Sequence, residues 1–108
     1  MNISAEEIRR KSEEFREQII TDRRHLHRIP EIGTDLPETS SYIKKKLDEM
    51  GIPWKDCGGR LPAQMTEDFV KAGFPRMEKE TGVAAVIGNG SPCILLRADM
   101  DALPIKED

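Results

Sequence analysis

The 108-residue sequence contains no apolar run near the roughly 18 residues that a membrane-spanning helix needs, and its first ten residues are charged. We therefore expect no membrane contact and no signal peptide, and we expect a cytoplasmic protein. A block of basic residues is also missing, because 17 basic and 20 acidic residues are mixed along the chain, for a net charge of -3. This composition gives no support for nucleic-acid binding.

Cysteine is scarce: Cys57 and Cys93 are far apart and form no C-x-x-C pair. Without a secretion signal, such residues are more typical of reduced thiols than of a disulfide. No Gly-x-Ser-x-Gly sequence is present, so nothing indicates the serine nucleophile of an α/β-hydrolase. The glycines at 88 and 90 lack the helix-opening context of a phosphate loop, and we interpret them as a turn.

Apolar residues recur at helical spacing in the first half of the chain. Ser4 and Glu7 have the spacing of a capping box, and an apolar stripe follows as far as Ile29. Pro30 then restricts the residue before it to non-helical backbone. The pattern predicts one long helix from about residue 4 to residue 29.

A second helix is predicted from about Pro37 to Met50, with Asp35 and Glu38 as a capping pair. Its expected buried residues are Ile43, Leu47 and Met50. The three lysines at 44–46 are interpreted as the solvated face of this helix, with a basic patch for a partner as the alternative.

Further along the chain, residues 52–55 indicate a short strand and residues 66–72 a short helix capped by Thr66. Residues 81–87 and 93–96 predict two strands of a hairpin, joined through the glycines at 88 and 90. The expected fold class is α/β, with two N-terminal helices and an incomplete mixed sheet.

Two carboxylates, Asp99 and Asp101, follow the last predicted strand. Ligand sites of open α/β sheets lie beyond the carboxyl ends of strands, and residues two apart in extended backbone point the same way. Adjacent carboxylates repel each other unless a cation or a shared proton lies between them, and a divalent metal is the usual solution. The alternative is a pair of solvated acids in a turn.

A second polar group is His25, His27 and Glu31 at the end of the first predicted helix. Histidines two residues apart do not share a helix face, so these two are poor joint metal ligands. We interpret His27 as structural. Glu31 is expected to hold the following loop or to pair with an arginine.

Several short motifs resemble, in the same order, those of the aminoacylase and carboxypeptidase-G-like metallopeptidase family. The chain is most similar to the branch of hippurate hydrolase and N-acyl-amino-acid amidohydrolases, and the resemblance covers nearly its whole length. The matching residues are Leu26-His27-x-x-Pro30-Glu31-x-Gly33, Thr39-Ser40, Gly51, Thr81-Gly82-Val83 and Leu96-Arg97-Ala98-Asp99-Met100-Asp101-Ala102-Leu103-Pro104.

The resemblance implies that residues 1–108 are the N-terminal part of a zinc-peptidase-like catalytic domain, with no second domain present. It implies hydrolysis of the amide bond of N-acyl amino acids or small peptides, aided by two divalent metal ions (Zn or Mn). It also implies a homodimeric full-length enzyme. The metal ligands are expected after Asp108, so this chain alone is predicted to bind no metal and to be inactive.

Residue by residue, the resemblance assigns Asp101 to an aspartate that orients a metal-bound ligand. Asp99 stands where related branches have a metal-binding histidine, a departure that puts direct ligation by Asp99 in doubt. His27, Glu31 and Arg97 match motif positions that we interpret as structural.

Two other functions remain in consideration. One is an aspartate-based phosphotransferase, although such enzymes place the first aspartate directly after the strand, and here Arg97 and Ala98 intervene. The other is a small non-catalytic module that binds a partner through an open sheet edge.

Overall fold

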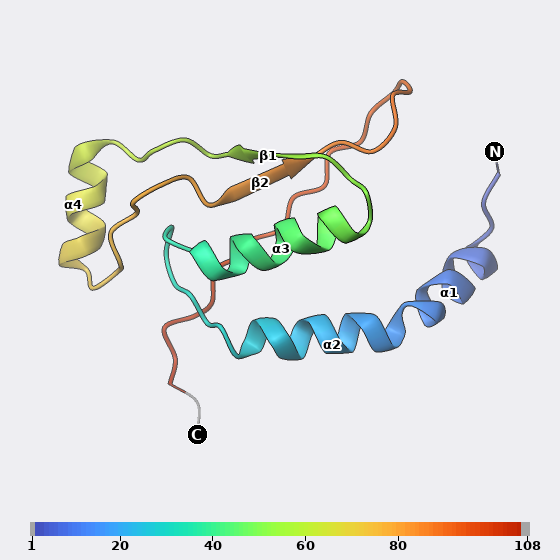
Figure 1. The fold of residues 1–108 in the computed structure, drawn as a ribbon, viewed down its shortest axis with the longest axis horizontal. Coiled ribbons are helices and arrows are strands. Elements are labelled where there is room, and N and C mark those ends of the chain that lie inside the picture. The colour runs from blue at the N-terminus through green and yellow to red at the C-terminus, as the bar shows by residue number, and fades with distance from the viewer. Residues whose placement is uncertain (1, 107–108) are drawn as a thin grey trace.

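A computed structural model describes residues 2–106 of the chain (Figure 1). Three helices are followed by a strand, a fourth helix and a second strand. The elements are α1 (Ala5–Glu14), α2 (Arg16–His27), α3 (Pro37–Glu49), β1 (Trp54–Cys57), α4 (Ala63–Lys71) and β2 (Gly82–Ala85). None of the helices in the described part of the chain is long and apolar enough to cross a membrane.

The first predicted helix is interrupted at Phe15, so the prediction of one continuous helix is wrong. The Ser12 hydroxyl donates to the Ile8 carbonyl at 2.8 Å, and the Phe15 N–H donates to the Ser12 carbonyl, three residues back, at 3.2 Å. A hydroxyl that is hydrogen-bonded to the carbonyl of the preceding turn bends a helix. A backbone hydrogen bond that spans three residues instead of four narrows the helix locally. The capping box of Ser4 and Glu7 is confirmed.

The apolar stripe along α1 and α2 is present but lies at the surface. Ile8, Phe15 and Ile19 are each more than half exposed, and α1 has no buried residue. They line an open groove of ≈ 870 Å³ together with Ile3 and Met50. Met50, which the helical pattern placed in the core, lies just after the end of α3 at Glu49 and is 65% exposed.

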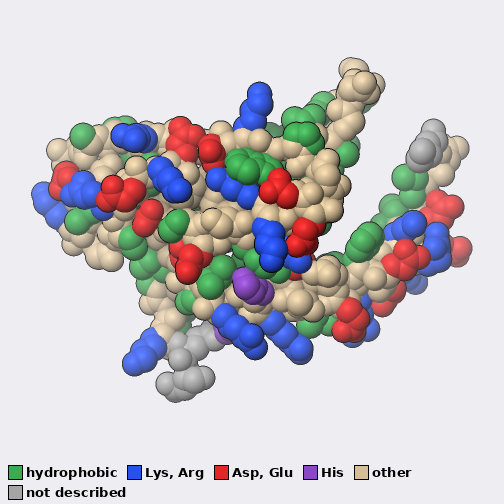
Figure 2. Space-filling view, in the orientation of Figure 1, with side chains coloured by type: hydrophobic (Ala, Val, Ile, Leu, Met, Phe, Trp, Pro, Cys, Tyr) green, Lys and Arg blue, Asp and Glu red, His purple; other side chains and the backbone are tan. Residues whose placement is uncertain are grey.

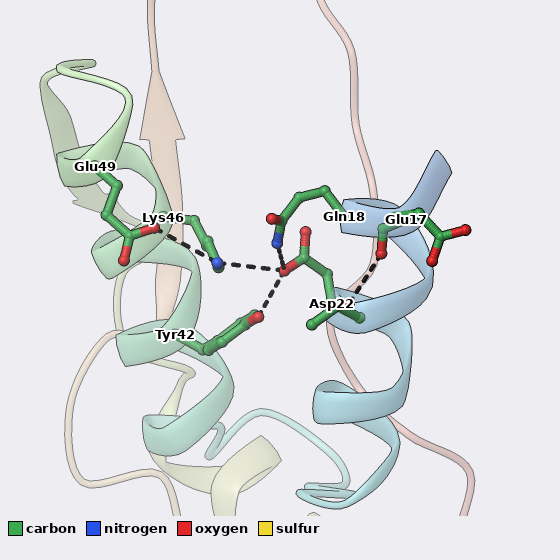
Figure 3. A network of polar contacts seen from close by, with 7 residues as sticks. Glu17, Gln18, Asp22, Tyr42, Lys46 and Glu49 are labelled. Atoms are coloured by element: carbon green, nitrogen blue, oxygen red, sulfur yellow. Dashed lines mark hydrogen bonds and ion pairs between the residues drawn. The ribbon is translucent and has the colours of Figure 1, made fainter. Parts of the chain in front are cut away.

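Asp22 ties α2 to α3, which lie side by side (Figures 1 and 3). One of its carboxylate oxygens accepts hydrogen bonds from Tyr42 at 2.6 Å and Gln18 at 3.0 Å, and lies 3.5 Å from the Lys46 ammonium. The Tyr42 hydrogen bond holds the pKa of Asp22 below its ordinary value, and the same bond raises the pKa of Tyr42. The His25 ring stacks on Tyr42 with centroids 4.0 Å apart.

The sequence indicated that the lysines of α3 form a solvated face, but two of the three are partly buried and paired with acidic residues. Lys44 is only 21% exposed, pairs with Asp56 of β1 at 2.6 Å and lies 4.6 Å from the centre of the Trp54 ring. Lys46 is 24% exposed and pairs with Asp22. Both side chains lie along neighbouring elements because their long methylene stems pack there while the ammonium groups find acidic partners.

The sheet has two antiparallel strands, β1 and β2, with Trp54 opposite Ala85 and Cys57 opposite Gly82. Helices with a small sheet confirm a mixed α and β composition, but the predicted hairpin is wrong. Residues 81–87 contribute β2, which pairs with β1 and not with residues 93–96. Sequence alternation indicates extended backbone, but it does not specify which strand will be the partner.

The helix predicted over residues 66–72 is present as α4 and begins earlier, at Ala63. Thr66 does not cap it, since its hydroxyl donates to the Pro62 carbonyl at 3.2 Å. Just after α4, the Phe74 ring packs edge to face against the Phe69 ring, with their centroids 5.7 Å apart.

Few residues are buried in the described chain, and each of them is 3–5% exposed: Leu36, Thr39, Ser40 and Thr81. The radius of gyration is 16.9 Å, compared with about 13 Å expected for a compact domain of this length. The fold is therefore open, and its best-buried residues gather where the α2–α3 connection (residues 28–36) meets α3 and β2.

Candidate functional site

The two longest motifs of the sequence meet in one hollow, although they lie at opposite ends of the chain. The hollow measures ≈ 460 Å³, and α2, the α2–α3 connection, α3 and residues 98–102 line it. Its lining includes His27, Glu31, Thr39, Asp99 and Asp101. The structure thus brings together all of the predicted site residues except Arg97, which does not line the hollow.

Glu31 is the residue that organises this region. Its carboxylate accepts hydrogen bonds from the backbone N–H of Glu38 at 3.1 Å and of Thr39 at 2.6 Å. These are N–H groups of the first turn of α3, which have no partner within the helix. The predicted capping pair of Asp35 and Glu38 is wrong, because Leu36 occupies the N-cap position and a residue outside the helix supplies the acceptor.

The backbone of Glu31 makes a second connection. Its carbonyl accepts a hydrogen bond from the Ala102 N–H at 2.7 Å. Within residues 2–106, no other backbone hydrogen bond joins residues 86–106 to the rest of the chain. Asp101, directly before Ala102, is held beside the α2–α3 connection by this contact.

Asp99 and Asp101 differ in their surroundings. Asp99 forms an ion pair with Arg97 at 3.0 Å, and both side chains are largely exposed, at 72% and 85%. An exposed pair of this kind contributes little to stability. Asp101 is exposed as well and has no ion pair or hydrogen bond to a described residue. Its carboxylate is therefore available for a ligand or a further part of a protein.

Other motif residues make contacts outside the hollow. Thr81 is 5% exposed, and its hydroxyl donates to the Thr34 carbonyl at 2.8 Å. Gly33 has a φ of 75°, and an added Cβ there would lie 3.2 Å from the Phe74 ring. The contributions of Thr34 and Phe74 were missed in the sequence, because a backbone acceptor and a single aromatic residue leave no recognisable pattern.

The residues described here do not form a metal site by themselves. Within residues 2–106, no three His, Cys, Asp or Glu side chains gather closely enough to hold a metal ion. The hollow offers two exposed carboxylates and His27 on separate segments. Carboxylates and imidazole are suitable ligand types, but a divalent ion needs more of them in one place.

Comparison with known proteins gives three informative relatives. The chain is 37% identical over 98 residues to IAA-amino acid hydrolase ILR1-like 5 of Arabidopsis thaliana, covering 90% of this chain and 18% of that protein. It is 41% identical over 92 residues to N-acetyl-L-cysteine deacetylase of Bacillus subtilis, covering 83% and 17%. It is 40% identical over 93 residues to an uncharacterized hydrolase of Staphylococcus aureus, covering 85% and 19%.

No family model matches the sequence, and no solved structure matches it. The class that the relatives' names define is that of hydrolases, with one name referring to IAA-amino acid and another to N-acetyl-L-cysteine. These relatives support the amidohydrolase family that includes hippurate hydrolase and the aminoacylases as the family of this chain. It spans less than a fifth of the length of the curated relatives it matches.

Proposed function

We propose that this chain forms the first part of the catalytic domain of a metal-dependent amidohydrolase that hydrolyses N-acyl amino acids. The observation that carries the proposal is its similarity, over most of the chain, to relatives named for IAA-amino acids and N-acetyl-L-cysteine. Both names describe an amino acid whose nitrogen carries an acyl group. The substrate proposed here is a small molecule of that kind.

In this proposal Asp101 contributes by orienting another side chain of the site, and Asp99 is its neighbour. The two divalent ions, Zn or Mn, would activate a water molecule and polarise the acyl carbonyl. Since residues 2–106 do not make a metal site, most of the ligands would come from further residues of a longer protein. That longer protein is proposed to be a homodimer.

The proposal is tested by an assay on two proteins, the 108-residue chain and a protein that carries it at the length of its relatives. Hippurate and N-acetyl-L-cysteine are the substrates, and free amino acid is the product measured. We expect no turnover by the chain alone. The longer protein should turn over one of the substrates and lose activity with a chelator. Chelator-sensitive turnover by the chain alone would contradict the division of the site proposed here.

A matched pair of variants tests whether the activity depends on a carboxylate that lines the hollow. In the longer protein, Asp101→Asn keeps the shape of the side chain and removes its charge, and we expect a large loss of kcat. Asp35→Asn makes the same chemical change in the α2–α3 connection, at a residue outside the hollow, and should leave kcat unchanged. Equal changes of kcat in the two variants would show that the reaction does not depend on the charge of Asp101 in particular.

A second candidate function, a non-catalytic module that binds a partner by its sheet edge, is favoured by one observation. Residues 93–96 carry three apolar side chains, Ile94, Leu95 and Leu96, that are each more than 80% exposed. Apolar extended segments of this kind add to sheet edges. Binding of a hydrophobic dye by a monomer would support an open edge, whereas a monomer that unfolds cooperatively and binds no dye would argue for a closed independent domain.

A further inference from the structure

Glu31 makes two kinds of contact that meet at the proposed site. Its side chain accepts from the first turn of α3, and its carbonyl accepts from Ala102. The side chain is half-buried, and Thr39, whose N–H it receives at 2.6 Å, is 5% exposed. Water cannot readily replace the carboxylate at a buried N–H, so loss of this acceptor leaves the helix end unsatisfied.

The Ala102 hydrogen bond is the one backbone hydrogen bond that joins residues 86–106 to the rest of the described chain, and the side chain of Asp101 has no hydrogen bond or ion pair there. Met100 and Ala102, on either side of Asp101, are half-buried and line the hollow. The backbone hydrogen bond that sets the position of Asp101 relative to α3 is therefore the one to the Glu31 carbonyl. That carbonyl is in turn fixed because the Glu31 side chain is anchored on α3.

From this chain of contacts we infer that Glu31 is a positioning residue for Asp101. It holds the segment that carries Asp101 against the start of α3, and its carboxylate acts through the backbone rather than on a substrate. The inference rests on the proposed function for its catalytic consequence, but the positioning itself concerns only contacts within this chain.

Amide hydrogen exchange of the 108-residue chain, measured by NMR, tests the positioning directly. In Glu31→Ala, exchange at Ala102 and Thr39 should become about tenfold faster, because a lost helix cap and an unsatisfied N–H weaken local structure. Exchange at Ile19, whose N–H donates to the carbonyl of Phe15 at the start of α2, should change less than about twofold, because that part of the helix lies outside the opened region.

Two further variants separate the loss of the Glu31 contact that holds the Asp101 segment from a destabilisation of the whole chain. Glu31→Gln keeps an acceptor oxygen, so exchange at Ala102 should return most of the way to the wild-type rate. Glu38→Ala removes a carboxylate from the same first turn of α3, one that makes no hydrogen bond or ion pair with described residues, and should leave Ala102 unchanged. Should Glu31→Ala unfold the chain, Glu31→Asp, whose shorter side chain draws the carboxylate away from the Thr39 N–H, carries the same comparison between Ala102 and Ile19. Equal acceleration at both amides, or none at Ala102, would overturn the inference.

The catalytic consequence is read separately, in the protein of full family length. We expect Glu31→Ala to lower kcat about tenfold with little change in KM, and Glu31→Gln to recover most of the rate, because misplacing a catalytic group slows the reaction without weakening substrate binding. An inactive wild-type protein would refute the proposed function and leave the exchange result standing. Normal kcat in Glu31→Ala with fast exchange at Ala102 would refute the catalytic consequence alone.

Discussion

Two parts of this molecule differ in how many of their side chains have partners within the described chain. In the linked region, which comprises the α2–α3 connection, α3 and the sheet, side chains and backbone groups from distant segments meet: Glu31 with Thr39, Thr34 with Thr81. In the exposed segment, residues 86–96, apolar side chains point into solvent (Figure 2). The first region holds itself together, and the second has no partner within residues 2–106.

The contrast between the linked region and the exposed segment shows which residues find their contacts within this chain. Polar motif residues such as Glu31 and Thr81 find their acceptors and donors within the chain, so the hollow beside Asp101 takes shape. Apolar residues such as Leu95 gain stability only when a surface covers them, and each fully covered large side chain contributes about 1.5–3 kcal/mol. The chain spans less than a fifth of its relatives, which is consistent with a covering surface that lies outside it.

A pair of glycine substitutions should separate the two regions most strongly. A Cβ added at Gly82 would lie 2.5 Å from the Cys57 carbonyl oxygen, whereas nothing lies within 4 Å of one added at Gly90. We expect Gly82→Ala to lower the free energy of unfolding by about 1–3 kcal/mol, because the backbone must shift to accept the methyl group. Gly90→Ala should have little effect. Urea unfolding followed by the fluorescence of Trp54 measures both, and equal losses would mean that the regions do not differ.

The next largest effect is expected at Glu31. Replacing it by alanine removes the cap of α3 and should cost about 0.5–2 kcal/mol of the free energy of unfolding. Asp35→Ala removes the neighbouring carboxylate that the sequence wrongly indicated as the cap, and it should cost much less. A larger loss at Asp35 would contradict the capping geometry.

A smaller effect is expected from the contact between α2 and α3. Tyr42→Phe removes the hydrogen bond to Asp22 and should cost about 1 kcal/mol at neutral pH. Because the folded-state pKa of Asp22 lies below its ordinary value of 3.8, its stabilising contribution is complete above that value and is lost as the pH falls through the folded-state pKa. Tyr42→Phe raises the folded-state pKa of Asp22, so stability measured as the pH falls from 6 should decline less steeply than in the wild type. An unchanged slope would exclude this linkage.

The smallest change in stability is expected in the exposed segment. Leu95→Ser removes an apolar side chain that is 91% exposed, and it should change the free energy of unfolding by less than about 0.5 kcal/mol. The same substitution should reduce the binding of a hydrophobic dye. A large loss of stability would show that Leu95 is covered in solution, and the two regions would then be alike.

The elements that the sequence predicted correctly depend on neighbouring residues. The capping box at Ser4 follows from a local cap pattern, and the extent of α3 and the presence of α4 follow from local apolar spacing, although the caps predicted for these two helices are wrong. The break at Phe15 was missed because Ser12 offers its hydroxyl to the preceding turn, a choice that apolar spacing does not reveal.

The contacts that build the candidate site are mostly non-local, and the sequence alone indicated them less well. That Glu31 holds the following loop was one of two expectations, but its acceptance of the Thr39 N–H in place of the Asp35 cap required the structure. Pairing of β2 with β1 was missed because residues 93–96 have an equally strand-like composition. Family resemblance identified the motifs, and the structure showed that Glu31 brings two of them together.

The proposed function makes the chain one part of an amidohydrolase for N-acyl amino acids, whose site the chain does not complete alone. The most direct measurement compares release of free amino acid from hippurate and N-acetyl-L-cysteine by the chain and by the protein of full family length. We expect no release by the chain and chelator-sensitive release by the longer protein. Activity of the chain alone, or a folded, metal-loaded longer protein that hydrolyses neither of these nor other N-acyl amino acids, would contradict it.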